Sequence, residues 1–232
     1  SLNCKFCATG KLKRMRNLNP DEIYDQVVLI SNQSKEFFNR PLTNIVFMGM
    51  GEPLMNYKNV LKSIDRITSK PGLGISSKRI VLSTSGIPKM IKKMADDKVK
   101  FKLAVSLHSA IDETRTSIMP FNKKMNLEEL IEALQYWYAK TKNIITYEYV
   151  IWTGINDKES DIKALIKFCK KVPSKVNLIQ YNSINDSNFN QASKEVLSEY
   201  IKQLDNNNIK ATIRKSRGQD IDAACGQLAN KT

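Results

Sequence analysis

Six short apolar segments alternate with helix-like segments along the chain, and this alternation limits the possible folds more than any other feature. Strands separated by helices imply βαβ units and a parallel sheet. Because the crossovers are right-handed, such a sheet becomes either a doubly wound sheet or a barrel of the TIM kind. We expect strands near residues 43–48, 79–84, 101–107, 145–151, 175–181 and 211–214. We expect helices near residues 20–38, 57–68, 88–98, 127–140, 158–170 and 194–204.

Local signals support several of these elements. Asn19 is a good helix cap, Pro20 suits the first helical position, and acidic residues follow it. Asn126 with Glu129 three positions later is a second helix start. The segment 43–48 reads as a buried strand that ends in a glycine-bearing exit loop.

No linker, low-complexity tract or further repeat divides the chain, so we expect one α/β domain over residues 1–232. Cys4 and Cys7 precede the first predicted helix, but no strand-like segment precedes them. We therefore expect a parallel barrel that lacks its first strand and has an exposed edge there. An N-terminal truncation would account for this.

Charge and composition favour a polyanionic partner. Lys and Arg number 37 against 23 Asp and Glu, a formal charge of +14, which makes RNA or DNA the first candidate and a merely basic surface the alternative. The absence of both a membrane-span-length apolar run and a secretory leader predicts a cytoplasmic protein without a membrane partner. Four cysteines are too few for a disulfide scaffold of this size.

The pair Cys4 and Cys7 has three interpretations. Zinc would need two further ligands at finger spacing, and the other candidates are single and far apart. A thioredoxin-type pair should follow a strand and open a helix, whereas a basic stretch follows here. A 4Fe–4S cluster with three cysteines needs an aromatic residue before the last one, and Phe6 is in that position. Its remaining cysteine would stand immediately before Ser1.

Four further motifs occur in order along the chain: 49–54 (GMGEPL), 82–86 (LSTSG), 105–108 (VSLH) and 220–228 (DIDAACGQL). Together with the cysteine pair they resemble the radical SAM RNA adenine methyltransferases, over essentially the whole chain. The resemblance implies a partial (β/α) barrel, a 4Fe–4S cluster and S-adenosylmethionine. It also implies methylation of adenosine carbon 2 in 23S rRNA and in tRNA beside the anticodon, with an electron donor for the cluster.

The resemblance also assigns residues. Cys4 and Cys7 would bind the cluster, and Cys225 would carry the methyl group as S-methylcysteine. A second cysteine would then release the product through a transient disulfide bond. The implied contacts to S-adenosylmethionine are Gly51, Glu52, Ser83, Ser106, Leu107, His108 and Asn182.

Several family features have no counterpart in this chain. The family's second cysteine, a glutamate proposed as base, and a small RNA-binding domain all precede the cluster motif, so we expect the chain alone to be incomplete for catalysis. Cys169 does not replace the second cysteine, because helical spacing places it on a core-facing stripe. Three alternatives stay open: a carbon-8 methyltransferase of the resistance type, a non-catalytic zinc or RNA-binding module, and a fragment without function.

Basic stretches beside the predicted site are candidates for RNA contact. The first stretch comprises Lys11, Lys13, Arg14 and Arg16, and the second Arg214, Lys215 and Arg217. A third group, which has six lysines between residues 89 and 102, reads more readily as a solvated helix face.

Overall fold

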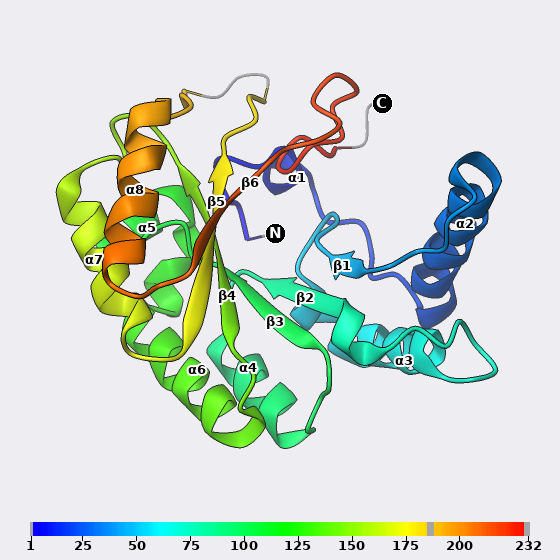
Figure 1. Ribbon diagram of the computed structural model, residues 1–232. Helices are drawn as coiled ribbons and strands as arrows, with labels where there is room; N and C mark the ends of the chain where they lie inside the picture. The colour runs from blue at the N-terminus through cyan, green and yellow to red at the C-terminus, as the bar shows by residue number, and fades with distance from the viewer. Residues whose placement is uncertain (1, 185–187, 230–232) are drawn as a thin grey trace.

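The computed structural model describes residues 2–184 and 188–229 and contains one sheet (Figure 1). The six strands are all parallel and lie in the order of the sequence. They are β1 Ile45–Phe47, β2 Ile80–Thr84, β3 Lys102–Ser106, β4 Ile145–Ile151, β5 Ser174–Gln180 and β6 Ala211–Arg214. A doubly wound sheet would reverse its strand order at a switch point. The sequential order therefore confirms the partial barrel and excludes the doubly wound alternative.

Most helices cover the outside of the curved sheet, whereas the short first helix lies beside the C-terminal loop (Figure 1). The helices are α1 Ala8–Lys11, α2 Pro20–Phe38, α3 Tyr57–Thr68, α4 Pro88–Asp96, α5 Asp112–Ile118, α6 Leu127–Thr141, α7 Glu159–Cys169 and α8 Lys194–Asn206. Short 3₁₀ turns cover Pro53–Asn56, Ser77–Arg79 and Pro120–Lys124. The sequence analysis missed α1 and α5, because both are too short to show an apolar period. None of the helices in the described ranges is long and apolar enough to cross a membrane.

Strand β1 differs from its prediction. The strand is present as predicted, but it is only three residues long and Val46 is 51% exposed, so the predicted burial is wrong. Within the described sheet β1 pairs only with β2, and it therefore has a neighbour on one side only. An edge strand of this kind covers less of its own surface than a central one.

Successive side chains along each strand point to opposite faces of the sheet, and they form two separate hydrophobic cores. On β4, Tyr147 packs against Phe168 of α7 and Tyr149 against Tyr200 of α8, so both point outward to the helices. The residue between them, Glu148, therefore points into the barrel. The larger core lies between sheet and helices. The smaller core comprises Ile118, Met119, Val150, Trp152, Ile179 and Tyr181, with Cys4 and Phe6 packed against it.

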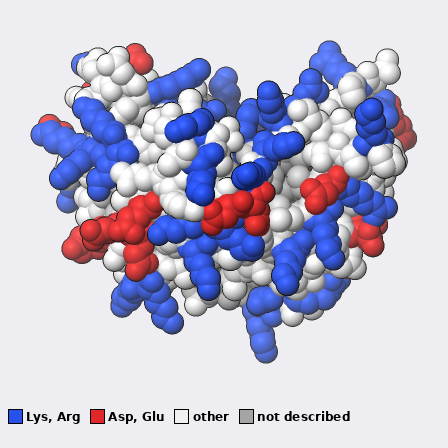
Figure 2. Space-filling view, turned by 90° about the horizontal axis from the view of Figure 1, so that it is seen from below, with Lys and Arg blue, Asp and Glu red and all other residues white. Residues whose placement is uncertain are grey.

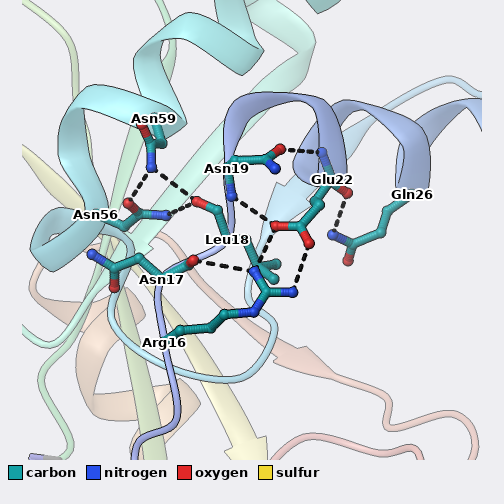
Figure 3. Close-up of polar contacts among 8 residues, drawn as sticks. All are labelled: Arg16, Asn17, Leu18, Asn19, Glu22, Gln26, Asn56 and Asn59. Carbon is teal, nitrogen blue, oxygen red and sulfur yellow. Dashed lines mark hydrogen bonds and ion pairs between the residues drawn. The ribbon is translucent and has the colours of Figure 1, made fainter.

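Hydrogen bonds hold the segment that joins the Cys4–Cys7 loop to α2 (Figure 3). The Asn19 side chain accepts from the Glu22 backbone N–H at 2.9 Å, and the Glu22 carboxylate accepts from the Asn19 backbone N–H at 2.8 Å. This capping box confirms the predicted helix start. Arg16 donates to the same carboxylate at 2.6 and 2.8 Å. Arg16, a candidate RNA contact, is thus bound within the protein.

Candidate functional site

The loop that holds Cys4 and Cys7 is anchored on α5 and on an aromatic group. The Lys5 backbone N–H donates to the Ile118 carbonyl at 3.0 Å. The Phe6 ring lies 4.8 Å from the His108 ring and 5.0 Å from that of Trp152. Both cysteines are free thiols that are partly buried. Burial and the neighbouring Cys7 raise the pKa of Cys4 to about 12, so the metal-free Cys4 thiol stays protonated at neutral pH.

The loop that carries Cys225 lies beside the cysteine-pair loop (Figure 1). The Ala8 backbone N–H donates to the Gly226 carbonyl at 2.8 Å, and the Thr9 hydroxyl donates to the Leu228 carbonyl at 2.7 Å. Gly226 has a φ of 85°, and a Cβ there would lie 3.3 Å from the Phe6 carbonyl oxygen. Glycine therefore permits the close approach of the two loops.

Cys225 is exposed. Partial burial of the thiol raises its pKa, the Arg214 guanidinium lowers it, and Cys7 and Glu148 raise it further. The next residue, Gly226, is hydrogen-bonded to Ala8, the residue after Cys7.

Asn182 holds the Cys225 loop from the strand side. It follows β5 and is buried, and its side-chain amide donates to the Cys225 carbonyl at 3.0 Å. Its side-chain oxygen accepts from Gln219. Both ends of this predicted cofactor contact therefore bind the C-terminal loop.

Glu52 joins the loop after β1 to the end of β2. Its carboxylate accepts from the Leu54 N–H at 3.0 Å, the Thr84 hydroxyl at 2.8 Å, and the Ser85 N–H and hydroxyl, each at 2.7 Å. Four donors occupy the lone-pair positions that a carboxylate offers. Within the described residues no Lys or Arg side chain forms an ion pair with Glu52. The neighbouring Gly51 has open space where a side chain would begin.

Of the predicted contacts on β2 and β3, two serines face the barrel interior. Ser83 follows Leu82, which packs in the outer core, and Ser106 follows the similarly packed Val105. Both serines are partly exposed, as a ligand contact requires. Leu107 differs, because its side chain is fully buried in the outer core. Its backbone N–H donates to the Glu148 carbonyl at 3.0 Å.

His108 supports the inner core. Its Nδ1 accepts from the Val150 backbone N–H at 3.1 Å, which assigns the ring proton to Nε2. Burial and the nearby Arg115 lower the pKa of His108 to about 3, so the ring is neutral at physiological pH. These contacts agree with a hydrogen-bonded ring and not with a base.

Arg115 is a site-organising residue that the sequence analysis missed. Its side chain is fully buried on α5 and donates to the carbonyls of Ser85 at 2.7 Å, Leu107 at 3.1 Å and Ser106 at 3.3 Å. It also donates to the Asn122 side chain. The guanidinium thereby joins the loops after β2 and β3. The only available signal was the Asp112–Glu113 pair, which suits a first helical turn.

Basic side chains are not confined to the site. Figure 2 views the molecule from below, away from the edge with the Cys225 loop, and shows many Lys and Arg there around a band of acidic residues. Two lysines of the third basic group on α4, Lys92 and Lys93, pair with Glu132 and Asp97. These pairs favour the solvated-face interpretation of α4.

Comparisons with known proteins place this architecture in a family. A model described as the radical SAM superfamily matches residues 1–169. A Flavobacterium psychrophilum protein named probable dual-specificity RNA methyltransferase RlmN is 69% identical over 100% of this chain and 67% of its own length. The Salinibacter ruber protein of the same name is 48% identical over 100% of this chain and 63% of its own. The chain belongs to the RlmN family of radical SAM proteins.

A solved structure supports the same assignment. The crystal structure of a radical SAM methyltransferase from Sphaerobacter thermophilus matches with a TM-score of 0.94 at 38% identity, over 97% of this chain and 66% of that one. The resemblance stated from the motifs is thereby confirmed. The chain spans about two thirds of the length of the curated relatives it matches.

Radical SAM proteins use a 4Fe–4S cluster and S-adenosylmethionine. Cys4 and Cys7 are free thiols on one loop, and soft thiolates are the ligand type that iron–sulfur clusters take. Among the described residues no group of three or more His, Cys, Asp or Glu side chains is placed to hold a metal ion.

Proposed function

We propose that this chain is the catalytic core of an S-adenosylmethionine-dependent radical methyltransferase that modifies carbon 2 of adenosine in 23S rRNA and in tRNA. In this proposal Cys4 and Cys7 bind the cluster, and Cys225 carries the methyl group as S-methylcysteine. A second cysteine, which the family places upstream of the cluster motif, releases the product by a transient disulfide bond. The enzyme acts in the cytoplasm and takes electrons from a separate donor.

One observation supports the proposal above the others. The backbone hydrogen bond from Ala8 to Gly226 and the side-chain hydrogen bond from Thr9 to Leu228 hold the Cys225 loop against the cysteine-pair loop. The two hydrogen-bonded pairs come from opposite ends of the chain, 219 positions apart for Thr9 and Leu228. A methyl-carrying thiol must reach the place where S-adenosylmethionine is cleaved, and this contact provides the proximity.

The remaining residues have separate tasks. When bound, the cluster supplies the electron that opens the sulfonium of S-adenosylmethionine. Glu52 would attract the cofactor ammonium through space, because four donors already occupy the lone-pair positions of its carboxylate. Ser83 and Ser106 offer hydroxyls on the interior face. Asn182 holds the Cys225 loop in place. The target adenosine must leave its stack to reach Cys225, as in other base-modifying enzymes.

The test uses the full-length protein with its cluster reconstituted anaerobically. It is incubated with ribosomal RNA and tRNA that lack the modification, and the nucleosides are separated by mass spectrometry. We expect 2-methyladenosine, whereas 8-methyladenosine would identify the resistance-type reaction. Iron and sulfide should be bound; zinc at about one per chain without methyl transfer would support the binding module instead.

Two cysteine variants complete the test. Cys225→Ala should abolish methyl transfer while 5′-deoxyadenosine formation persists. Cys169→Ala is the matched control, because Cys169 is buried in the outer core, and it should retain methyl transfer. Unimpaired transfer by Cys225→Ala would refute the proposed mechanism.

A further inference from the structure

A buried carboxylate inside the barrel has an unsatisfied oxygen. The Glu148 side chain on β4 is 5% exposed, and its Oε1 accepts from the Asn177 side-chain amide at 2.9 Å. Its Oε2 has no hydrogen-bond partner within the described residues. A buried carboxylate oxygen without a donor is costly, so a group that donates a hydrogen bond to it is stabilised there.

The arrangement of the strands shows that Glu148 faces the site. Parallel register places Ser106 on β3 opposite Glu148 and Asn177 on β5 beside it. Registered neighbours in a parallel sheet project to the same side, so Glu148 continues the row that begins with the predicted cofactor contact Ser106.

Arg214 provides the opposite charge. It ends β6, and its Nη1 lies 3.6 Å from Glu148 Oε2 and 3.4 Å from the sulfur of Met48, which follows β1. A guanidinium that reaches both β4 and the exit of β1 must project across the barrel interior. The sequence analysis assigned Arg214 to RNA phosphate, but the structure turns it inward. At 3.6 Å the pair is not hydrogen-bonded, so both groups keep hydrogen-bonding capacity.

The pair also lies near the methyl-carrying thiol. The strand register places Arg214 opposite Ile179 on β5, and Asn182, three residues further along the chain, donates to the Cys225 carbonyl at 3.0 Å. In addition, the Arg214 charge lowers the pKa of Cys225 and the Glu148 charge raises it. A base whose carbon 2 reaches Cys225 would therefore lie close to an acceptor and a donor inside the barrel.

We propose that Glu148 and Arg214 form the subsite that recognises the edge of the target base. The carboxylate accepts a hydrogen bond from the exocyclic amine of adenine, and the guanidinium donates to a ring nitrogen. Guanine presents a carbonyl and a ring N–H along that edge, so the same pair opposes it. This inference rests on the proposed function and deepens it by naming the groups that select the base.

The test is a double-mutant cycle in which the enzyme loses the Glu148 carboxylate and the substrate loses the exocyclic amine of adenine. The full-length enzyme receives a short RNA hairpin that contains adenosine or purine riboside, which lacks only the exocyclic amine, at the target position. We expect the wild-type enzyme to prefer adenosine by roughly ten- to hundred-fold, the range for a hydrogen bond to a charged group. Glu148→Ala should methylate both hairpins at a similar, lower rate, and Glu148→Gln should keep part of the preference.

Controls separate this role from stability and from cofactor binding. Thr212→Val alters the same row on β6, where Thr212 bonds to Asn177 and not to Glu148, and should keep the preference for adenosine. Thermal unfolding is measured for every variant, and the Gln variant, which keeps the shape of Glu148, replaces Ala if Ala unfolds. The dependence of 5′-deoxyadenosine formation on S-adenosylmethionine concentration should not change in Glu148→Ala.

Three results would overturn the inference. One is an adenosine preference that persists in Glu148→Ala. Another is a weakened dependence on S-adenosylmethionine with the preference intact, which would assign the pair to the cofactor ribose. The third is a wild-type enzyme that methylates adenosine and purine riboside equally. If the wild type forms no methyladenosine at all, the proposed function fails first and the inference with it.

Discussion

Replacement of the buried Arg115 by Met tests how the site is held together. The guanidinium donates to three backbone carbonyls and to Asn122. In the Met variant the Leu107 carbonyl keeps the Ser109 N–H at 2.7 Å, whereas the carbonyls of Ser85 and Ser106 and the Asn122 side chain lose the guanidinium donor. Each buried unsatisfied acceptor costs about 1–3 kcal/mol, and release of a buried charge offsets part of the sum. We therefore expect a loss of about 3–5 kcal/mol in the free energy of unfolding.

Loss of function should accompany this loss of stability in a specific way. Arg115 holds the carbonyls of Ser106 and Leu107 after β3 and that of Ser85 after β2, and Ser85 in turn donates to Glu52. Burial lowers the pKa of Arg115 to about 10, so its charge is present at neutral pH. Arg115→Lys keeps that charge without the planar fork, and it should raise the KM for S-adenosylmethionine more than it lowers kcat.

Urea unfolding of the full-length protein measures the first effect, and initial rates of 5′-deoxyadenosine formation measure the second. Arg66→Met is the matched control, because the Arg66 side chain is 50% exposed in its ion pair with Asp21. It should cost at most about 1 kcal/mol. A loss below 1 kcal/mol in Arg115→Met, or an unchanged KM in Arg115→Lys, would refute the reasoning.

Two further predictions concern pH and loop contact. Burial lowers the His108 pKa to about 3 in the folded state, below the value of about 6.5 in the unfolded chain. The free energy of unfolding should therefore fall as pH decreases from 6.5 towards 3, by up to about 1.4 kcal/mol per pH unit. His108→Gln should flatten that slope in urea titrations at pH 7 and pH 5, and equal slopes would contradict the assignment. Gly226→Ala should speed amide exchange at Ala8, because a Cβ there approaches the Phe6 carbonyl at a positive φ. Gly74→Ala is the control, because Gly74 also has a positive φ but has open space around it. If the Ala8 amide exchanges as slowly in both variants as in the wild type, the close approach of the Gly226 and Phe6 loops is unimportant.

Local chemistry made much of the fold predictable. The α2 start follows from Asn19 and Pro20, and the helix covers Pro20–Phe38 as expected. Strand β4 also matches its prediction at Ile145–Ile151, because β-branched and aromatic residues occupy every position of it except Glu148. Helix α5 was missed because seven residues between two loops show no period, and with it Arg115 was missed.

The candidate site was predictable only as a set of residue types. Position after a strand indicated that Glu52 and Ser83 lie at the same edge. It did not indicate that four donors surround the Glu52 carboxylate, since Thr84 and Ser85 come from another strand. Hydrogen bonds between segments that are distant in the sequence depend on the curvature of the sheet, and no local sequence pattern predicts that curvature.

The order of strands and helices, the parallel sheet and the family membership follow from the sequence by itself, because they depend on periodicity and on short motifs. Tertiary structure alone decided the placement of Cys225 beside the Cys7 loop and the inward turn of Arg214 towards Glu148. The physical reason is that curvature of the sheet sets which side chains meet across the barrel. Residues far apart in the sequence contact one another inside the barrel, and their sequence separation does not predict the distance between their side chains.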